Sequence, residues 1–133
     1  MLIYLSRLYV EQYESMDEQV ERTLLKQYRA LINTNYEQVH DVASYADMLN
    51  ISPGYLSEVI KEQCGKPASE LIHERLMIEA KRLLFYTEQS VKELAFKLGF
   101  SDVSYFVRFF KRQSGNTPAA YRNASREKYH QNL

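Results

Sequence analysis

The sequence predicts an all-α protein, and three observations support that prediction. Apolar residues recur at spacings of three and four along nearly the whole chain of 133 residues. No stretch alternates apolar and polar residues for long enough to form a sheet, and glycine and proline are scarce, at 4 and 3 residues. A hydrophobic content of 45% excludes wholesale disorder. At this length the chain forms one compact domain or two very small ones.

The first 17 residues are predicted to form a separate amphipathic helix. Its apolar stripe consists of Leu5, Leu8, Tyr9, Gln12 and Met16. The segment lacks the basic start and cleavage site of a signal peptide and is too short to cross a bilayer, so we expect no membrane association. An isolated helix of this length is marginal in water and needs a partner. Two alternatives stand: the helix contributes to a homodimer interface, or it folds back on its own domain.

The central part of the chain contains an internal duplication. Asp41 to Ser52 reads DVASYADMLNIS, and Ser90 to Ser101 reads SVKELAFKLGFS. At an offset of 49 four positions are identical, and after one inserted residue a further four are identical at an offset of 50. The pairs are Val42/Val91, Ala46/Ala95, Leu49/Leu98 and Ser52/Ser101, then Tyr55/Tyr105, Lys61/Lys111, Gln63/Gln113 and Gly65/Gly115. One supersecondary unit therefore occurs twice.

Each copy has the start and stop signals of a short helix, a tight turn and a second helix. Asp, Ser and Thr cap helix N-termini, while Asn and Gly tolerate the left-handed conformation that ends helices. In chain order the paired signals are Asp41 and Ser90, Asn50 and Gly99, Ser52 and Ser101, then Gly65 and Gly115. Each copy is therefore predicted to be a helix-turn-helix unit.

Three further helices surround the two units. One runs from Val20 to about Asn35, one from Ala68 to Leu84, and a short one begins at Thr117 and Pro118, while residues 123–133 are expected to fray. The middle helix makes a rod of roughly 25 Å. The predicted domains are 1–17, an N-terminal helix; 18–66, a first helix-turn-helix unit; 67–86, a linker helix; 87–124, a second unit; and 125–133, a polar tail.

Charge and residue content restrict the function. The net charge is zero, but residues 35–89 carry five Lys/Arg against nine Asp/Glu, whereas residues 90–133 carry eight against three. The second unit is therefore the better partner for a polyanion. The single Cys64 rules out an internal disulfide and points to a reducing compartment. The spacing of His40, His73 and His130 suggests no metal site, and no glycine-rich phosphate loop exists, so we expect no enzyme and no cofactor.

The second helix of each unit is predicted to bury one face and expose the other. At about 100° per residue, Phe106, Phe109 and Phe110 share one side. The opposite face carries Ser104, Val107, Arg108 and Lys111, and the corresponding face in the first copy carries Gly54, Ser57, Glu58 and Lys61. In a helix-turn-helix this helix enters the major groove, where Arg108 can bind guanine O6 and N7 and Val107 can contact a thymine methyl.

The stretch ELAFKLGFSDVSYFVRFFKRQSGNTPAAYR resembles the signature of the AraC/XylS family of bacterial transcription regulators, and LNISPGYLSEVIKEQCGKPASELI resembles the family's first motif. The resemblance covers residues 20–122. It implies two recognition helices that read successive major grooves, an activator that contacts RNA polymerase, a cytoplasmic, nucleoid-associated protein, and a preceding sensing or dimerising domain. The implied base-reading residues are Gly54, Ser57, Glu58, Lys61, Ser104, Val107, Arg108 and Lys111, with phosphate contacts near Ser52, Ser90 and Ser101.

Glu58 departs from the family pattern, in which Arg is common at this position. Its carboxylate can accept a hydrogen bond from cytosine N4, or it can be a poor DNA contact held by Lys61 or Lys66. Together with the acidic first section, it keeps open a rival function class. In that alternative the chain is a helical protein–protein interaction module that has kept the fold and lost its affinity for DNA.

Overall fold

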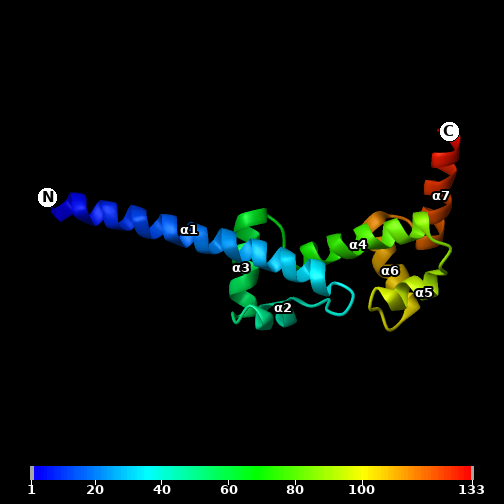
Figure 1. The fold of residues 1–133 in the computed structure, drawn as a ribbon, viewed down its shortest axis with the longest axis horizontal. Helices are drawn as coiled ribbons and strands as arrows, with labels where there is room; N and C mark the ends of the chain where they lie inside the picture. Colours follow the sequence, from blue (N-terminus) through cyan, green and yellow to red (C-terminus); the bar gives the residue numbers. More distant parts are fainter. Residues whose placement is uncertain (1, 133) are drawn as a thin grey trace.

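The structure is a computed structural model that describes residues 2–132 and the side chains of residues 16–132. The described residues form helices joined by short loops, with no strand among them, which confirms the all-α prediction (Figure 1). The helices are α1 (Leu2–Asn35), α2 (Val42–Met48), α3 (Pro53–Cys64), α4 (Ala68–Tyr86), α5 (Val91–Lys97), α6 (Val103–Ser114) and α7 (Pro118–Gln131). The pairs α2–α3 and α5–α6 are the two helix-turn-helix units.

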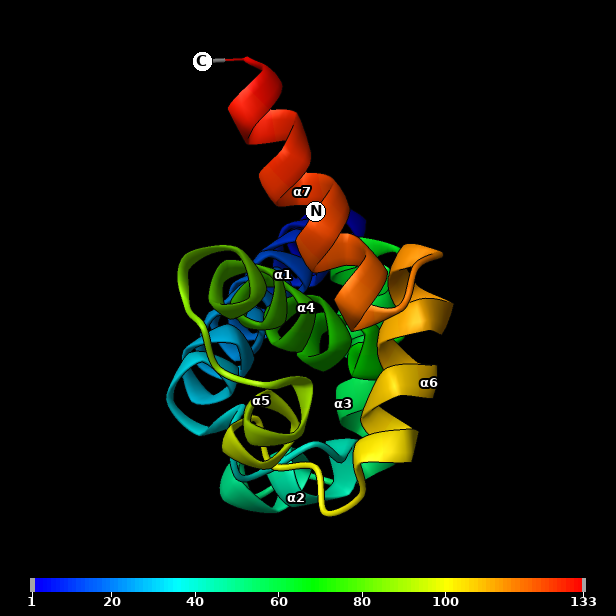
Figure 2. The ribbon, with the colours of Figure 1, turned by 90° about the vertical axis from the view of Figure 1, so that its right-hand side faces the viewer.

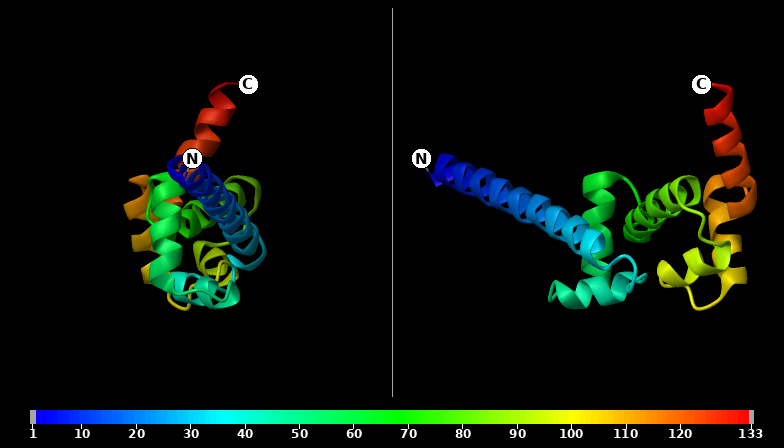
Figure 3. Two further views of the ribbon diagram at one scale, coloured as in Figure 1. Left: turned by 90° about the vertical axis from the view of Figure 1, so that its left-hand side faces the viewer. Right: turned by 45° about the vertical axis from the view of Figure 1, so that its right-hand side comes forward.

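The helix α1 replaces the two separate helices expected at the N-terminus. It runs without a break from Leu2 to Asn35, and its first half extends away from the other helices (Figures 1 and 3). The segment therefore does not fold back on the domain in this structure. The side chains of Leu5, Leu8, Tyr9 and Gln12 lie outside the described residues. The second half packs on the first unit through a buried row made of Leu24, Tyr28 and Ile32.

The turn signals of the duplication are confirmed except at Ser101. Asn50 and Gly99 lie between the helices of their units with positive φ angles of 58° and 90°. Ser52 Oγ accepts a hydrogen bond from the backbone N–H of Tyr55 at 3.1 Å, which caps α3. Ser90 caps α5 in the same manner.

The predicted cap at Ser101 is wrong. Asp102 caps α6 instead, because its Oδ1 accepts a hydrogen bond from the N–H of Ser104 at 2.8 Å. Ser52 corresponds to Asp102 at the offset of 50 that relates the second helices of the two units. The inserted residue therefore lies before the cap of α6, within the turn, and Ser101 belongs to that turn.

The C-terminal helix α7 is also longer than expected, since it continues through Gln131 where the sequence suggested fraying. Arg122 and Arg126 both donate hydrogen bonds to the backbone carbonyls of Leu84 and Thr87. The ring of Tyr129 packs edge-on against Phe85, with centroids 5.5 Å apart. These contacts with the end of α4 hold α7 in place.

The linker helix α4 contributes to the cores of both units. Its N-terminal part meets α1 and α3, and Tyr28 donates a hydrogen bond from its hydroxyl to the carbonyl of Ala68 at 2.7 Å. The helix also meets α5, α6 and α7, and its contact with α6 reaches back to His73, whose ring lies 5.2 Å from that of Phe109. The buried apolar side chains of α4 are Ala68, Leu71, Ile72, Leu76, Met77, Ala80, Leu83 and Leu84. One helix therefore joins the two units and supplies part of each core.

Candidate nucleic-acid interface

The second helices of the two units lie on the same side of the molecule. Viewed along the long axis of the molecule, α6 lies in front of α3 at the same edge, and the two helices run in the same direction (Figure 2). The opposite end view gives the same arrangement (Figure 3). Because α4 separates the units along the long axis, α3 and α6 form two parallel ridges on one face (Figure 1). We call this face the ridge face.

An aromatic core fixes the orientation of α6. Phe106, Phe109 and Phe110 are between 0% and 3% exposed. The Phe106 ring packs against Phe100 at 5.1 Å between centroids, and the Phe110 ring packs edge-on against Tyr121 at 5.6 Å. Aromatic pairs of this kind stabilise beyond the burial of their area, so the helix cannot easily rotate about its axis.

With that side buried, α6 presents the predicted face outward. Ser104, Arg108 and Lys111 are exposed and Val107 is half-buried. Among the described residues, no hydrogen bond or ion pair engages the Arg108 or Lys111 side chain. Two cationic side chains on α6 are therefore available for an anionic or guanine-bearing ligand.

The helix α3 also buries one face and exposes the other, but its exposed face carries an acidic residue, Glu58. Leu56, Val59 and Ile60 are at most 1% exposed. The opposite face carries the exposed residues Gly54, Ser57, Glu58 and Lys61. The structure therefore brings all eight predicted base-reading positions onto the outer faces of α3 and α6.

Glu58 is not held by either of the lysines considered for that role. Lys61 Nζ donates to the carbonyl of Gly65 at 3.3 Å, and Lys66 Nζ pairs with Glu74 at 2.6 Å. No ion pair involves Glu58 within the described part of the chain. At the offset of 50, Glu58 corresponds to Arg108. The two ridges therefore carry opposite charges at this one pair of equivalent positions, whereas Lys61 and Lys111 match in charge.

The predicted phosphate contacts differ from one another in geometry. Ser52 and Ser90 are exposed caps whose hydroxyl oxygens accept backbone N–H groups, which leaves each hydroxyl hydrogen free to be donated. Ser101 is exposed but lies one residue before the cap, and the Asp102 carboxylate occupies the start of α6. That negative charge makes the N-terminus of α6 a poorer anion site than the N-terminus of α3.

Two exposed aromatic residues were not assigned a role from the sequence. Tyr55 and Tyr105 occupy equivalent positions in the first turns of α3 and α6 and are 41% and 51% exposed. A tyrosine hydroxyl can donate to a phosphate oxygen. The signal was present in the sequence, because the pair matches at the offset of 50, but periodicity alone could not distinguish an exposed tyrosine from a core one.

Metal-holding clusters and membrane-spanning helices are both absent from the part of the chain that the structure describes. No group of three or more His, Cys, Asp or Glu side chains is arranged to hold a metal ion there. None of the described helices combines the length and apolar character that a membrane span requires.

Paired helix-turn-helix units with parallel outer helices on one face define a double helix-turn-helix nucleic-acid-binding domain. A family model described as a helix-turn-helix domain matches residues 45–124, which is more than half of the chain. The chain belongs to the AraC/XylS family of transcription regulators, and this is its DNA-binding fold.

Similar proteins share this part of the chain. The regulatory protein PocR of Salmonella typhimurium is 33% identical over 93 residues, which cover 70% of this chain and 30% of PocR. The C-terminal domain of the response regulator yesN from Fusobacterium nucleatum is 33% identical with a TM-score of 0.69, covering 73% of this chain and 95% of that domain. The DNA-binding domain of AdpA, solved with a target DNA, is 27% identical with a TM-score of 0.70, covering 78% and 94%. The chain spans less than half the length of the curated relatives it matches first.

Proposed function

We propose that this chain is the sequence-specific DNA-binding part of a transcription regulator and that it inserts α3 and α6 into successive major grooves on one face of a duplex. The observation that carries the proposal is the ridge face, where both outer helices present polar side chains opposite a buried row. The complex of the AdpA domain with its target DNA supports it by analogy.

The linker α4 holds the two outer helices apart along the long axis of the molecule (Figure 1). The linker α4 has 19 residues, which corresponds to a length of roughly 28 Å. Successive major grooves on one face of B-DNA are about 34 Å apart. The two outer helices contact α4 at different points along its length, and the ring of Phe109 on α6 lies 5.2 Å from that of His73.

Each ridge is assigned a reading role from its side chains. On α6, Arg108 binds guanine O6 and N7 and Val107 contacts a thymine methyl, flanked by Ser104 and Lys111. On α3, Glu58 accepts from cytosine N4, while Gly54 lets the backbone approach the bases, and Ser57 and Lys61 complete the face. Ser52 and Ser90 donate to phosphates, with the turn at Ser101 adding a weaker contact.

The remaining roles concern the longer protein to which such a domain belongs in its relatives. The proposed regulator is an activator that contacts RNA polymerase in the cytoplasm, at the nucleoid. The extended first half of α1 is proposed to contribute to a homodimer. Sedimentation that finds only monomers at high concentration contradicts that last assignment.

A titration by fluorescence anisotropy tests the DNA-binding proposal. The probe is a duplex selected from a random library by the wild-type chain, measured at two salt concentrations. Phosphate contacts release counterions, so binding should weaken steeply as salt rises. Arg108→Ala should weaken the selected duplex by about 1–3 kcal/mol and relax the preference at one base pair. If no duplex is preferred and salt has no effect, the rival interaction module is the better description.

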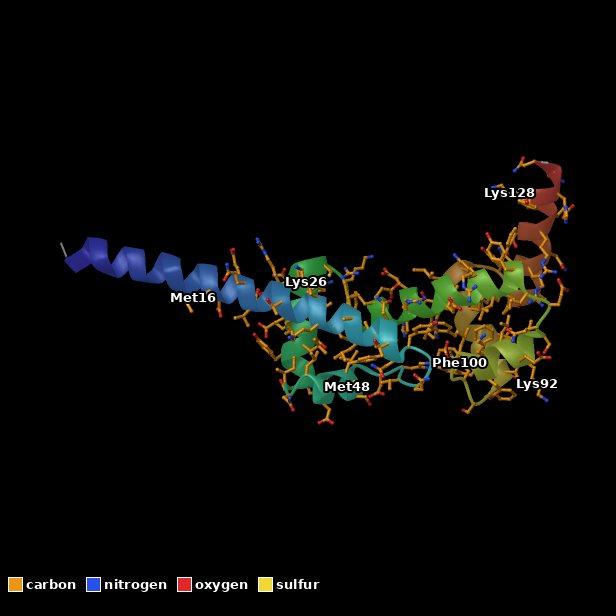
Figure 4. The ribbon with its side chains drawn as sticks, in the orientation of Figure 1. Met16, Lys26, Met48, Lys92, Phe100 and Lys128 are labelled. Atoms are coloured by element: carbon orange, nitrogen blue, oxygen red, sulfur yellow. The ribbon has the colours of Figure 1, made fainter. Side chains whose placement is uncertain are left out.

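Lys128→Ala is the matched control for charge. It removes one positive charge from an exposed site on the outer part of α7, which projects away from α3 (Figure 4). We expect it to leave the selected duplex bound nearly as tightly as by the wild type. An equal loss in both variants would mean that α6 contributes only net charge and reads no base.

Glu58→Gln separates the two roles considered for Glu58. If the carboxylate accepts from cytosine N4, the amide of the variant can still accept there but can also pair with adenine, so the preference for cytosine at one base pair of the first half of the site should relax to include adenine. If Glu58 only repels phosphate, the variant binds every duplex more tightly by a similar factor. The second result would remove Glu58 from the reading residues.

A further inference from the structure

The two helix-turn-helix units touch at a second place besides α4. The loop at residues 36–40, between α1 and α2, reaches the turn between α5 and α6. His40 Nε2–H donates a hydrogen bond to the carbonyl of Leu98 at 2.8 Å, and the His40 ring lies 4.9 Å from the Phe100 ring between centroids. The two loops are adjacent in Figures 1 and 3, and Phe100 is labelled in Figure 4. We call the contact between residues 36–40 and 98–100 the clasp.

The clasp leaves no room for a side chain at Gly99. A Cβ at this position would overlap the carbonyl oxygen of Glu37 and lie 3.0 Å from His40 Nε2. The equivalent residue in the first unit is Asn50. It also has a positive φ, of 58°, which asparagine adopts more readily than most residues. The second unit therefore has two reasons for glycine at its turn, the positive φ and the close approach of the first unit, and only the former applies to Asn50.

The loop of residues 36–40, which is the first unit's part of the clasp, is itself fixed at both ends. The Arg75 guanidinium of α4 stacks over the Tyr36 ring at 4.2 Å, and Arg75 Nε donates to Asn33 Oδ1 at 2.8 Å. At the far end, the hydroxyl of Tyr45 donates to the carbonyl of Val39 at 2.9 Å. The loop is therefore held against α1, α2 and α4. Its contact with the turn of the second unit can then fix the orientation of that unit relative to the first.

We propose that the clasp fixes the orientation of the second unit relative to the first, and that Gly99 and His40 are positioning residues for binding to two grooves at once. A single helix such as α4 bends, so alone it leaves the units free to change their relative orientation. A second contact away from the α4 axis removes that freedom. The part of this inference that concerns DNA rests on the proposed function, whereas the part that concerns orientation does not.

Residual dipolar couplings in the free protein test the orientation directly. In the wild type, the amides of α2–α3 and of α5–α6 should fit one common alignment tensor. Gly99→Asn adds a side chain that a turn of this kind accepts in the first unit, so it should open the clasp, and the two units should then require different tensors. If Gly99→Asn keeps one common tensor, α4 alone fixes the units and the proposal fails.

Gly115→Asn is the matched control for backbone strain. Gly115 has a φ of 87°, close to the 90° of Gly99, and nothing lies within 4 Å of a Cβ built there. The control should keep the single tensor. If it separates the tensors as Gly99→Asn does, strain in a helix stop and not the clasp is responsible, and the proposal is wrong.

Variants of His40 test the other side of the contact. His40→Ala removes the donor to Leu98 without altering the second unit, while His40→Gln restores an N–H donor. In His40→Ala we expect the two units to require different alignment tensors. In His40→Gln we expect the two tensors to become more similar again. One common tensor for His40→Ala would overturn the role of His40.

The same variants connect the clasp to DNA. The probe is the library-selected duplex and a copy with one base pair inserted between its two halves. A rigid wild type should lose at least tenfold in affinity on the insertion, whereas Gly99→Asn should lose much less, because a loose pair of units adjusts to either spacing. An equal loss in both proteins contradicts the proposal. If no duplex is preferred at all, the proposed function fails. The residual dipolar couplings then still test whether the clasp fixes the orientation of the units.

Discussion

Two arginines on α7 bind the same two carbonyls, and this redundancy predicts a non-additive effect of mutation on stability. Arg122 donates to Leu84 O at 2.9 Å and to Thr87 O at 3.2 Å, and Arg126 donates to the same oxygens at 3.2 and 2.6 Å. The last carbonyls of a helix have no partner within the helix. The perturbations are Arg122→Met, Arg126→Met and the double variant, since methionine keeps an apolar stem without the charge.

The expected losses in the free energy of unfolding follow from the number of side-chain donors that each carbonyl keeps. In each single variant both carbonyls keep one charged donor, so the free energy of unfolding should fall by about 1 kcal/mol. The ion pair between Arg126 and Glu88 at 3.1 Å adds little, because Glu88 is 91% exposed. In the double variant both acceptors lose their side-chain donors, at about 1–3 kcal/mol each. At the middle of that range the double loss is about 4 kcal/mol, so it should exceed the sum of the single losses by about 2 kcal/mol.

Urea unfolding followed by circular dichroism measures this coupling. The slope of the free energy against urea should stay the same in all four proteins, so that the differences report stability. A double-mutant cycle that is additive within about 0.5 kcal/mol would refute the reasoning. In that case water or another donor already satisfies the carbonyls, and the two arginines act independently.

Three further predictions concern the cores. Phe110→Ala removes a fully buried ring and should lower the free energy of unfolding by about 3–5 kcal/mol in the same urea assay, and a loss under 1 kcal/mol would contradict it. Tyr28→Phe removes the buried hydroxyl that donates to the carbonyl of Ala68 and should lower the free energy of unfolding by about 1 kcal/mol, a prediction that an unchanged midpoint rejects. Burial lowers the pKa of His73 below its usual 6.5, so the unfolded chain takes up the proton more readily and stability should fall as the pH drops below that value. His73→Gln should show a smaller fall between pH 8 and 5, and identical pH profiles would exclude the effect.

Local signals in the sequence predicted the helix-turn-helix units well. Ser52 and Ser90 cap their helices, and Asn50 and Gly99 stop theirs, because caps and stops depend on residues two to four positions away. The outward face of α6 followed from periodicity for the same reason. The wrong cap at Ser101 came from the inserted residue, whose place in the turn the two offsets did not determine.

The features that the sequence did not reveal depend on distant contacts. The extension of α7 rests on Arg122 and Arg126 meeting carbonyls between 35 and 42 positions earlier in the chain. The steric need for Gly99 arises from Glu37, which belongs to the other unit. The continuity of α1 could have been predicted from the sequence, because neither glycine nor proline occurs before Pro53. The charged residues that interrupt the apolar stripe suggested a break instead.

The uninterrupted α1 has a mechanical consequence. With 34 residues it is roughly 50 Å long, and its inner half supplies Leu24, Tyr28 and Ile32 to the core on which α3 rests. Because the helix is unbroken, any part of a tilt of its outer half that is not taken up by bending reaches that core. A close-packed core admits only small rotations before its side chains clash. The part of a tilt that the outer half does not absorb therefore becomes strain beneath the first ridge.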